Sequence, residues 1–338
     1  MKHRLFACVL LLAPICFASE PPPLPAPGRL VDVGGWSLHL NCSGKVSAAQ
    51  PTVILEAGTG DFSVEWSLVQ PRVATFARVC SYDRAGDGWS ELGPHPRTMH
   101  QVAYELHTLL GNAGERPPYV LVGHSYGGWL VRVYRSMYPA DVAGLVLIDG
   151  GADNPWRKMP DGKLVRSQDL VAAKKVPAVK TDHPLRIEEI PPQALDAMKA
   201  GLPEAVAHAN DPPRNKLPLD AQRMRTWALG RPEHVAAAVN PFVEEELRDL
   251  HAEHANGEIA LGDLPLAVIT RGRTEDAGDD LEGLRRKEYV ALAALSRHGA
   301  HVVAARSGHH VQIEEPELVA TTIRQIVGAA RAADKIAR

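Results

Sequence analysis

A serine flanked by glycines is the residue of this sequence that most directly suggests chemistry. Residues 123–128 read Gly-His-Ser-Tyr-Gly-Gly, which places Ser125 in the pattern G-x-S-x-G. An apolar run at 119–122 precedes it and a helical pattern at 127–137 follows, so we expect a sharp turn between a strand and a helix. Such a turn exposes the hydroxyl and directs the backbone N–H of Tyr126 toward a developing oxyanion. The pattern therefore predicts that Ser125 is a nucleophile for acyl transfer.

A serine hydroxyl needs a base to take its proton, and a histidine late in the chain is the expected source. The chain has 15 histidines, so position must identify the base. His309 lies in Ser-Gly-His-His-Val-Gln at 307–312, after an apolar run at 301–304 and before the last helical pattern. We expect this loop to carry His309 back over the serine, with His310 pointing the other way.

The third group of such a site is a carboxylate that orients the imidazole and stabilises its positive charge. The sequence offers two places for it. Asp149 ends the apolar run at 144–148, whereas Glu275 and Asp276 follow the run at 266–270. We favour Asp149 slightly and keep Glu275 as the alternative.

A second glycine-rich turn, Glu-Ala-Gly-Thr-Gly-Asp at 56–61, follows the apolar run at 52–56. It can aim a backbone N–H, that of Thr59, at the same oxygen as the N–H of Tyr126. A phosphate-binding loop would require Lys followed by Ser or Thr, which this turn lacks. No group of His, Asp or Glu has the spacing of metal ligands, so we expect neither a metal nor another cofactor.

Eight short runs rich in aliphatic residues, most of them separated by helix-length segments, predict a largely parallel sheet with helices on both faces. Only Gly34 and Gly35 separate the first two runs, which indicates an antiparallel hairpin there. An amphipathic helix at 316–332 is expected to pack on the sheet. The eight runs are residues 29–33, 36–41, 52–56, 78–82, 119–122, 144–148, 266–270 and 301–304.

The alternation of strands and helices is interrupted between residues 151 and 262, where helical patterns occur near 192–200, 220–229 and 241–255. We interpret 151–262 as a helical lid inserted into one sheet domain. The predicted domains are a signal peptide at 1–18, a Pro-rich linker at 19–28, a core at 29–150 and 263–338, and the lid.

The N-terminal residues are typical of a secretory signal, because Lys2 and Arg4 precede an apolar run at 5–18 that ends in the small residue Ala18. The run is too short to span a bilayer comfortably. We therefore expect an exported protein, periplasmic or extracellular, with an uncleaved membrane anchor as the alternative. After cleavage Cys42 and Cys80 remain, and two thiols can pair in an oxidising compartment.

The composition excludes few partners but names none. The chain has 338 residues, of which 45% are hydrophobic and 23% charged, as in ordinary soluble domains. Its net charge of −3 favours neither nucleic acid nor an anionic membrane. The expected partner is a small acyl substrate, and the oligomeric state is open.

These motifs together resemble the α/β-hydrolase superfamily over essentially the whole mature chain, and most closely its bacterial exported or membrane-associated hydrolases. The resemblance implies that fold, catalytic roles for Ser125 and His309, and oxyanion donors at Thr59 and Tyr126. The motifs that carry it are those at 56–61, 82–90, 123–128 and 307–309.

The resemblance also implies that the second strand lies antiparallel to the fourth, so that Cys42 faces Cys80 and forms a disulfide with it.

Members of this superfamily cleave several kinds of bond, and those that act on carbon–halogen bonds or epoxides carry aspartate where Ser125 stands. A serine therefore favours a carboxylic ester hydrolase that works through an acyl-enzyme. Two alternatives stay open: a catalytically silent ligand-binding or scaffold protein, and a cofactor-free perhydrolase. The candidates to line an apolar acyl pocket are Trp129, Trp156 and Trp227.

Overall fold

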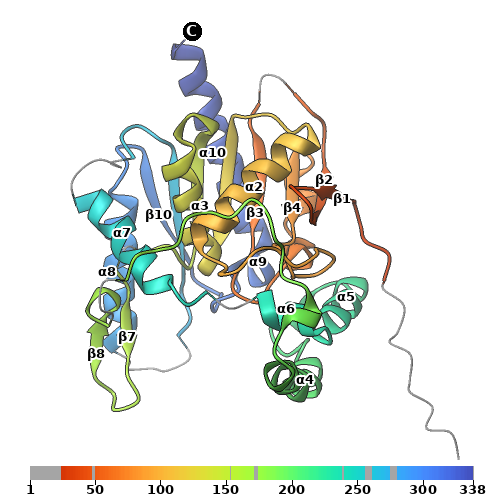
Figure 1. Cartoon of the computed structure of the whole chain (residues 1–338). Coiled ribbons are helices and arrows are strands. Elements are labelled where there is room, and N and C mark those ends of the chain that lie inside the picture. Colours follow the sequence, from red (N-terminus) through yellow and green to blue (C-terminus); the bar gives the residue numbers. More distant parts are fainter. Residues whose placement is uncertain are drawn as a thin grey trace, which may run out of the picture.

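The computed structural model describes residues 24–47, 50–152, 154–170, 174–237, 240–255, 261–274 and 280–337. At its centre is an eight-stranded sheet in the order β1-β2-β4-β3-β5-β6-β9-β10 (Figure 1). The expected sheet is confirmed, and the predicted signal at 1–18 lies outside the described residues. The strands are β1 (Arg29–Asp32), β2 (Ser37–Ser43), β3 (Thr52–Glu56), β4 (Val79–Tyr82), β5 (Tyr119–His124), β6 (Val142–Ile148), β9 (Leu266–Arg271) and β10 (Gly299–Ala304).

In this sheet β2 runs against the other seven strands. β1 pairs with β2, and β2 with β4, in antiparallel fashion. Every later pair, from β4–β3 to β9–β10, is parallel. The parallel strands therefore end at one common edge, where the segments that follow them meet.

Two helical layers cover the sheet because each strand presents apolar side chains to both of its faces. Ile54 of β3 points into one core with α2 (Met99–Ala113) and α3 (Tyr126–Met137). Val53 and Leu55 point into a second core on the other face, with α10 (Pro316–Ala337). Continuous apolar runs are typical of strands buried on both faces. In the part of the chain that the structure describes, no helix has both the length and the apolarity needed to cross a membrane.

The insertion after β6 is not purely helical. It begins with a hairpin of β7 and β8, which the sequence analysis did not predict because these short strands carry arginine and lysine rather than an apolar alternation. In Figure 1 this hairpin and α7 lie on one side of the molecule, and α4, α5 and α6 lie together on the other. The elements are β7 (Trp156–Lys158), β8 (Leu164–Arg166), α4 (Pro192–Ala207), α5 (Leu219–Leu229), α6 (Pro232–Ala237) and α7 (Val243–Ala255), and the core resumes with β9 and α8 (Asp280–Ala293).

A buried group of charges joins the insertion to the core. Asp61 and Glu65 follow β3, and both side chains are almost completely buried. Arg214 and Arg225 of the insertion each place a guanidinium nitrogen 3.0 Å from Asp61 Oδ1, and Arg225 also pairs with Glu65. Burial opposes ionisation of Asp61, but the two guanidinium groups outweigh it and hold its pKa well below the usual value. These ion pairs fix α5 against the core.

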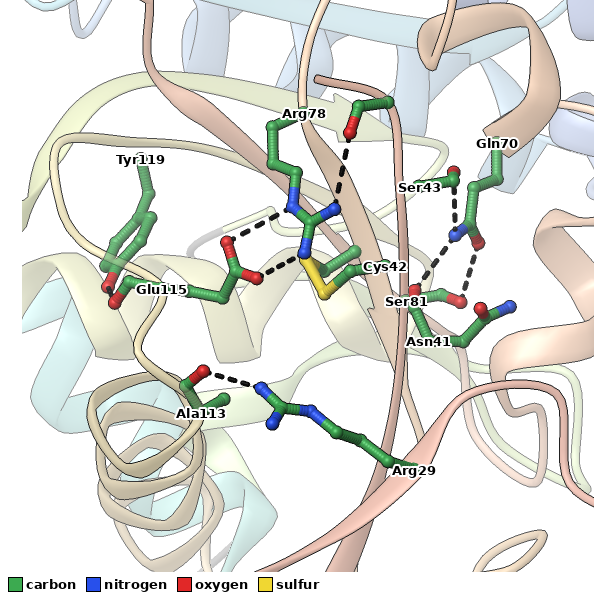
Figure 2. Close-up of a disulfide and its surroundings, with 12 residues drawn as sticks. Arg29, Asn41, Cys42, Ser43, Gln70, Arg78, Ser81, Ala113, Glu115 and Tyr119 are labelled. Atoms are coloured by element: carbon green, nitrogen blue, oxygen red, sulfur yellow. Dashed lines mark hydrogen bonds and ion pairs between the residues drawn. A yellow bond between two sulfur atoms is a disulfide. The ribbon is translucent and has the colours of Figure 1, made fainter. Parts of the chain in front are cut away.

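The disulfide implied by the resemblance is present. Cys42 of β2 stands directly opposite Cys80 of β4, with 4.0 Å between their Cα atoms. Figure 2 shows it beside the ion pair of Arg78 with Glu115, whose closest atoms are 2.6 Å apart. The bond therefore ties the antiparallel edge of the sheet to its first parallel strand.

Reduction of this disulfide is expected to lower the free energy of unfolding by about 4 kcal/mol, because it releases a loop closed over 38 residues. Urea titrations with and without reductant measure the difference. A double variant, Cys42→Ser with Cys80→Ser, serves as the control, since its midpoint should not respond to reductant. Mass spectrometry that finds two free thiols in the untreated protein would contradict the prediction.

Replacement of Arg225 by Met is expected to lower the free energy of unfolding by about 3 kcal/mol, because it leaves two buried carboxylates short of a partner. Arg223→Met is the matched control on the same helix. Its side chain is 75% exposed and pairs only with Asp220 among the described residues, so its effect should stay within about 0.5 kcal/mol. Equal losses in the two variants would show that the buried network does not stabilise the fold.

Candidate active site

Ser125 occupies the turn between β5 and α3 in a conformation that is rare for a residue with a side chain. Its φ is 53° and its ψ is −118°. Such strain persists only where surrounding bonds hold it. The N–H of Ser125 donates to the carbonyl of Ile148 at 2.9 Å, and its carbonyl accepts from the N–H of Gly128 at 3.0 Å. The turn is therefore fixed from the neighbouring strand and from the helix.

Two glycines make this turn sterically possible. A Cβ atom on Gly123 would lie 2.3 Å from the carbonyl oxygen of Gly127. A Cβ atom on Gly127 would lie 2.6 Å from the carbonyl oxygen of Glu56. Neither clash could be relieved without moving backbone, so β5, α3 and β3 approach closely only because both positions are glycine.

His309 lies in the loop between β10 and α9 (Val311–Glu314), where it reaches the serine. Its Nε2 is 3.0 Å from Ser125 Oγ, although 184 positions separate the two residues. The loop is held by its own contacts, since the N–H of Gly308 donates to Glu314 Oε2 at 2.7 Å. The imidazole is thus placed over the hydroxyl by a short, hydrogen-bonded loop.

Asp149 is the carboxylate that meets this imidazole. Its Oδ2 lies 2.6 Å from His309 Nδ1, and its Oδ1 accepts from the N–H of Arg271 at 3.2 Å. Like Ser125, it has a positive φ, of 45°. The alternative carboxylates, Glu275 and Asp276, lie outside the described residues. Among the described residues, Asp149 completes a line of three side chains.

The electrostatics of this line favour one arrangement of protons. The Asp149 side chain is 3% exposed and that of His309 is 34% exposed. Burial opposes ionisation of Asp149, but the hydrogen bond and charge of His309, together with Arg271, outweigh it and hold the pKa of Asp149 below its usual value. An ionised Asp149 accepts the Nδ1 hydrogen of His309, which leaves Nε2 free to accept the hydroxyl proton.

A second imidazole, that of His124, contacts the loop that carries His309. Its Nε2 lies 2.9 Å from the carbonyl oxygen of His309, and its Nδ1 lies 3.3 Å from Gln312 Nε2. Burial, with the neighbouring histidines, lowers the pKa of His124 to about 3. A neutral ring fits both contacts, because Nε2–H donates to the carbonyl while Nδ1 accepts from the amide. His124 therefore holds the loop without placing a positive charge beside His309.

The two expected oxyanion donors border the same cavity. Tyr126 is the first residue of α3, where a backbone N–H has no partner within the helix, and Thr59 lies in the turn after β3. Arg84 holds that turn in place, because it donates to the carbonyl oxygens of Ala57 at 2.8 Å and Gly58 at 2.6 Å. A turn fixed by charged hydrogen bonds is suited to present an N–H without reorganisation.

Arg84 is a supporting residue that the sequence analysis did not identify. Its guanidinium pairs with Glu56 at 2.7 Å, so the positive charge of Arg84 is balanced while the same group holds the turn. The one signal available was its place in the motif at 82–90, which carries the family resemblance. No local pattern shows that this arginine reaches a turn more than 20 positions earlier.

Two neighbouring cavities lie at the site, and Ser125 lines one of them. The oxyanion cavity, of about 210 Å³, is lined by Thr59 and Tyr126 among others. The triad cavity, of about 250 Å³, is lined by Ser125, Asp149 and His309 among others. They share two lining residues, Trp129 and Arg157.

The expectation of an apolar pocket lined by three tryptophans is only partly met. Trp129 lines both cavities and Trp156 lines the triad cavity. Trp227 lines neither, because it packs against Trp89 with 5.4 Å between ring centroids. Arginines also line both cavities. One of them, Arg157 of the insertion, lines both and lies over the Trp129 ring. Isolated arginines in a polar insertion carry no sequence signal for such a role.

One set of side chains that could in principle bind a metal lies beside the site. Donor atoms of Asp61, His124 and His310 fall within 4.8 Å of one another. The Asp61 carboxylate already accepts from Arg214 and Arg225, each at 3.0 Å. Two guanidinium charges at this distance oppose the binding of a cation, so this donor set fits the ion-pair network better than a metal.

Comparison with known proteins identifies the family and the fold. The model of the alpha/beta hydrolase family matches residues 53–322. The AB hydrolase superfamily protein of Gibberella zeae is 24% identical over 305 residues, which cover 85% of this chain and 89% of that protein. A thermophilic esterase from Thermogutta terrifontis has a TM-score of 0.57 at 19% identity, with 90% of this chain and 98% of the esterase covered.

An epoxide hydrolase has a similar fold, with a TM-score of 0.56 at 18% identity, covering 89% of this chain and 98% of the other. At these identities the solved structures show likeness of fold alone. The family model, in contrast, extends from β3 into α10 and includes the serine, the carboxylate and the histidine. The protein belongs to the alpha/beta hydrolase family.

Proposed function

We propose that the protein is a serine hydrolase that cleaves a carboxylic ester, or a related acyl bond, through an acyl-enzyme on Ser125. One observation carries the proposal: Ser125, His309 and Asp149 form an unbroken line of hydrogen bonds, of 3.0 Å and 2.6 Å. This arrangement of hydroxyl, imidazole and carboxylate activates a serine for attack on a carbonyl carbon.

The reaction divides into two transfers of the acyl group. His309 Nε2 takes the hydroxyl proton while Ser125 Oγ bonds to the carbonyl carbon, and the resulting oxyanion faces the N–H groups of Thr59 and Tyr126. His309 then gives its proton to the leaving oxygen, the bond between acyl carbon and leaving oxygen breaks, and the acyl-enzyme remains. Water repeats the sequence, with His309 again as base, and releases the acid with Ser125 restored.

Asp149 contributes by holding the ring and its charge. An ionised carboxylate at Nδ1 keeps the hydrogen there and stabilises the imidazolium that forms when Nε2 takes the serine proton. The low pKa of Asp149 keeps it ionised throughout the neutral range. The backbone N–H of Arg271 on its other oxygen prevents the carboxylate from turning away.

Ser125→Ala is expected to abolish labelling by a fluorophosphonate probe together with ester hydrolysis, because the nucleophile is lost. Asp149→Asn is expected to lower kcat about ten-thousandfold, because an amide favours the wrong tautomer of His309. Glu275→Gln is the matched control for the acid and should lower kcat less than twofold. The measurements are probe labelling followed by electrophoresis, and hydrolysis of short p-nitrophenyl esters.

Each outcome of this comparison has one meaning. Absence of labelling from the unmodified protein would favour a catalytically silent protein on the same fold. Labelling that survives Ser125→Ala would show that a residue other than Ser125 is the reactive nucleophile. A larger loss with Glu275→Gln than with Asp149→Asn would assign the acid to the segment after β9 instead.

We also propose that the protein is exported. The signal-like residues at 1–18 and a disulfide in the folded chain both support an oxidising compartment. Expression in a bacterium, followed by N-terminal sequencing of the exported fraction, should find a chain that begins at Ser19. Retention of the full-length chain in the cytoplasm would be inconsistent with this proposal.

A further inference from the structure

The two cavities at the site have different relations to Ser125 and His309, which bear on where the two halves of a substrate would lie. His309 must protonate the leaving oxygen, so the leaving group has to lie on the side that His309 faces. His309 lines the triad cavity together with Ser125, and it is not among the residues that line the oxyanion cavity. The leaving alcohol is therefore assigned to the triad cavity, and the acyl group to the oxyanion cavity beside Thr59 and Tyr126.

The oxyanion cavity has a positive lining. Three arginines and one carboxylate, that of Asp87, border it. Glu56, Glu105 and Glu244 each pair with one of the arginines and do not line the cavity. Asp87, which does line it, also pairs with Arg84. An anion in the cavity would therefore meet three guanidinium groups and one carboxylate, an excess of positive charge at the lining. The lining arginines are Arg84, Arg97 and Arg157, and their respective partners are Glu56, Glu105 and Glu244.

Two of these arginines are committed to the protein. Arg84 uses both terminal nitrogens for carboxylates and for the carbonyl oxygens of the oxyanion turn. Arg97 holds Glu105 with two hydrogen bonds of 2.6 Å. Both side chains are almost fully buried, so neither can turn toward a ligand without breaking these bonds.

Arg157 differs in having hydrogen-bonding capacity to spare. Its Nε donates to Ser167 Oγ at 2.9 Å and its Nη2 donates to Glu244 at 2.8 Å. Among the described residues, no protein group accepts from its Nη1. The two bonds that Arg157 does make hold the guanidinium, which lies 5.9 Å from the centre of the Trp129 ring, where the two cavities meet.

We propose that the substrate has a short acyl group that ends in a carboxylate, and that Arg157 binds this carboxylate as the specificity-determining residue. The inference rests on the proposed function and adds the substrate class. The cavity of about 210 Å³ limits the length of the acyl group, and its charged lining disfavours a plain alkyl chain. The guanidinium supplies charged hydrogen bonds that a neutral acyl group cannot use.

The test compares two methyl esters of equal acyl length, monomethyl glutarate and methyl pentanoate, which differ in a terminal carboxylate or methyl group. Hydrolysis is followed by titration of the released acid at constant neutral pH, and the quantity compared is the ratio of the two kcat/KM values. The unmodified protein should favour the glutarate ester. In Arg157→Gln this ratio should fall about tenfold or more, the loss expected for a charged hydrogen bond.

Lys163→Gln is the matched control. Lys163 lies at the exposed turn of the same hairpin, lines neither cavity, and loses the same charge on substitution. Its ratio should equal that of the unmodified protein. A second measurement needs no variant. Added salt should lower the preference of the unmodified protein for the glutarate ester, because screening weakens the attraction of the charged ester and leaves the neutral ester unaffected.

Fluorophosphonate labelling of Ser125, measured in parallel, separates the two levels of the inference. No labelling would overturn the proposed function itself. Labelling without preference for the glutarate ester, or without hydrolysis of either ester, would overturn the substrate class alone. An equal fall for both esters in Arg157→Gln would leave the ratio unchanged, and would show that Arg157 is a structural part of the hairpin instead of a substrate-binding residue.

Discussion

A single imidazole ring, that of His309, lies within hydrogen-bonding distance of both Ser125 and Asp149, and this double contact constrains the rest of the structure. The three residues follow different strands, β10, β5 and β6. Parallel strands bring their ends to one edge of the sheet, but β9 separates β6 from β10. The histidine loop must therefore cross the end of β9. At the end of β9 the N–H of Arg271 donates to the Asp149 carboxylate, so β9 is joined to the residue that contacts His309.

Charged side chains around these three residues are buried, and pairing with opposite charges offsets the free energy lost when they leave water. Arg84 holds the turn that carries Thr59, and neutral His124 holds the carbonyl of His309. An isolated charge in such surroundings would be strongly destabilising, whereas each arginine here meets a carboxylate or several carbonyl oxygens. The turn at Thr59 and the loop of His309 are thereby held in place by contacts within the protein.

The core and the insertion divide the work of the site. The sheet and its turns supply Ser125, His309 and Asp149, whereas the insertion supplies Arg157 and Trp156 as cavity walls. An esterase and an epoxide hydrolase share the overall fold with this chain at less than 20% identity. A common scaffold with different chemistry is expected when function depends on a few side chains and on the shape of the space above them.

The sequence by itself determined the eight strands, the turn at Ser125 and the loop that carries His309, because each depends on a local pattern of apolar residues and glycines. It did not predict the β7–β8 hairpin, whose polar strands have no such pattern. Only the tertiary structure decided that Asp149 meets His309 across 160 positions, and that Arg157 is held by Glu244 across 87. The physical reason is that such contacts depend on the paths of loops and the order of strands. Neither leaves a pattern in any single segment of the sequence.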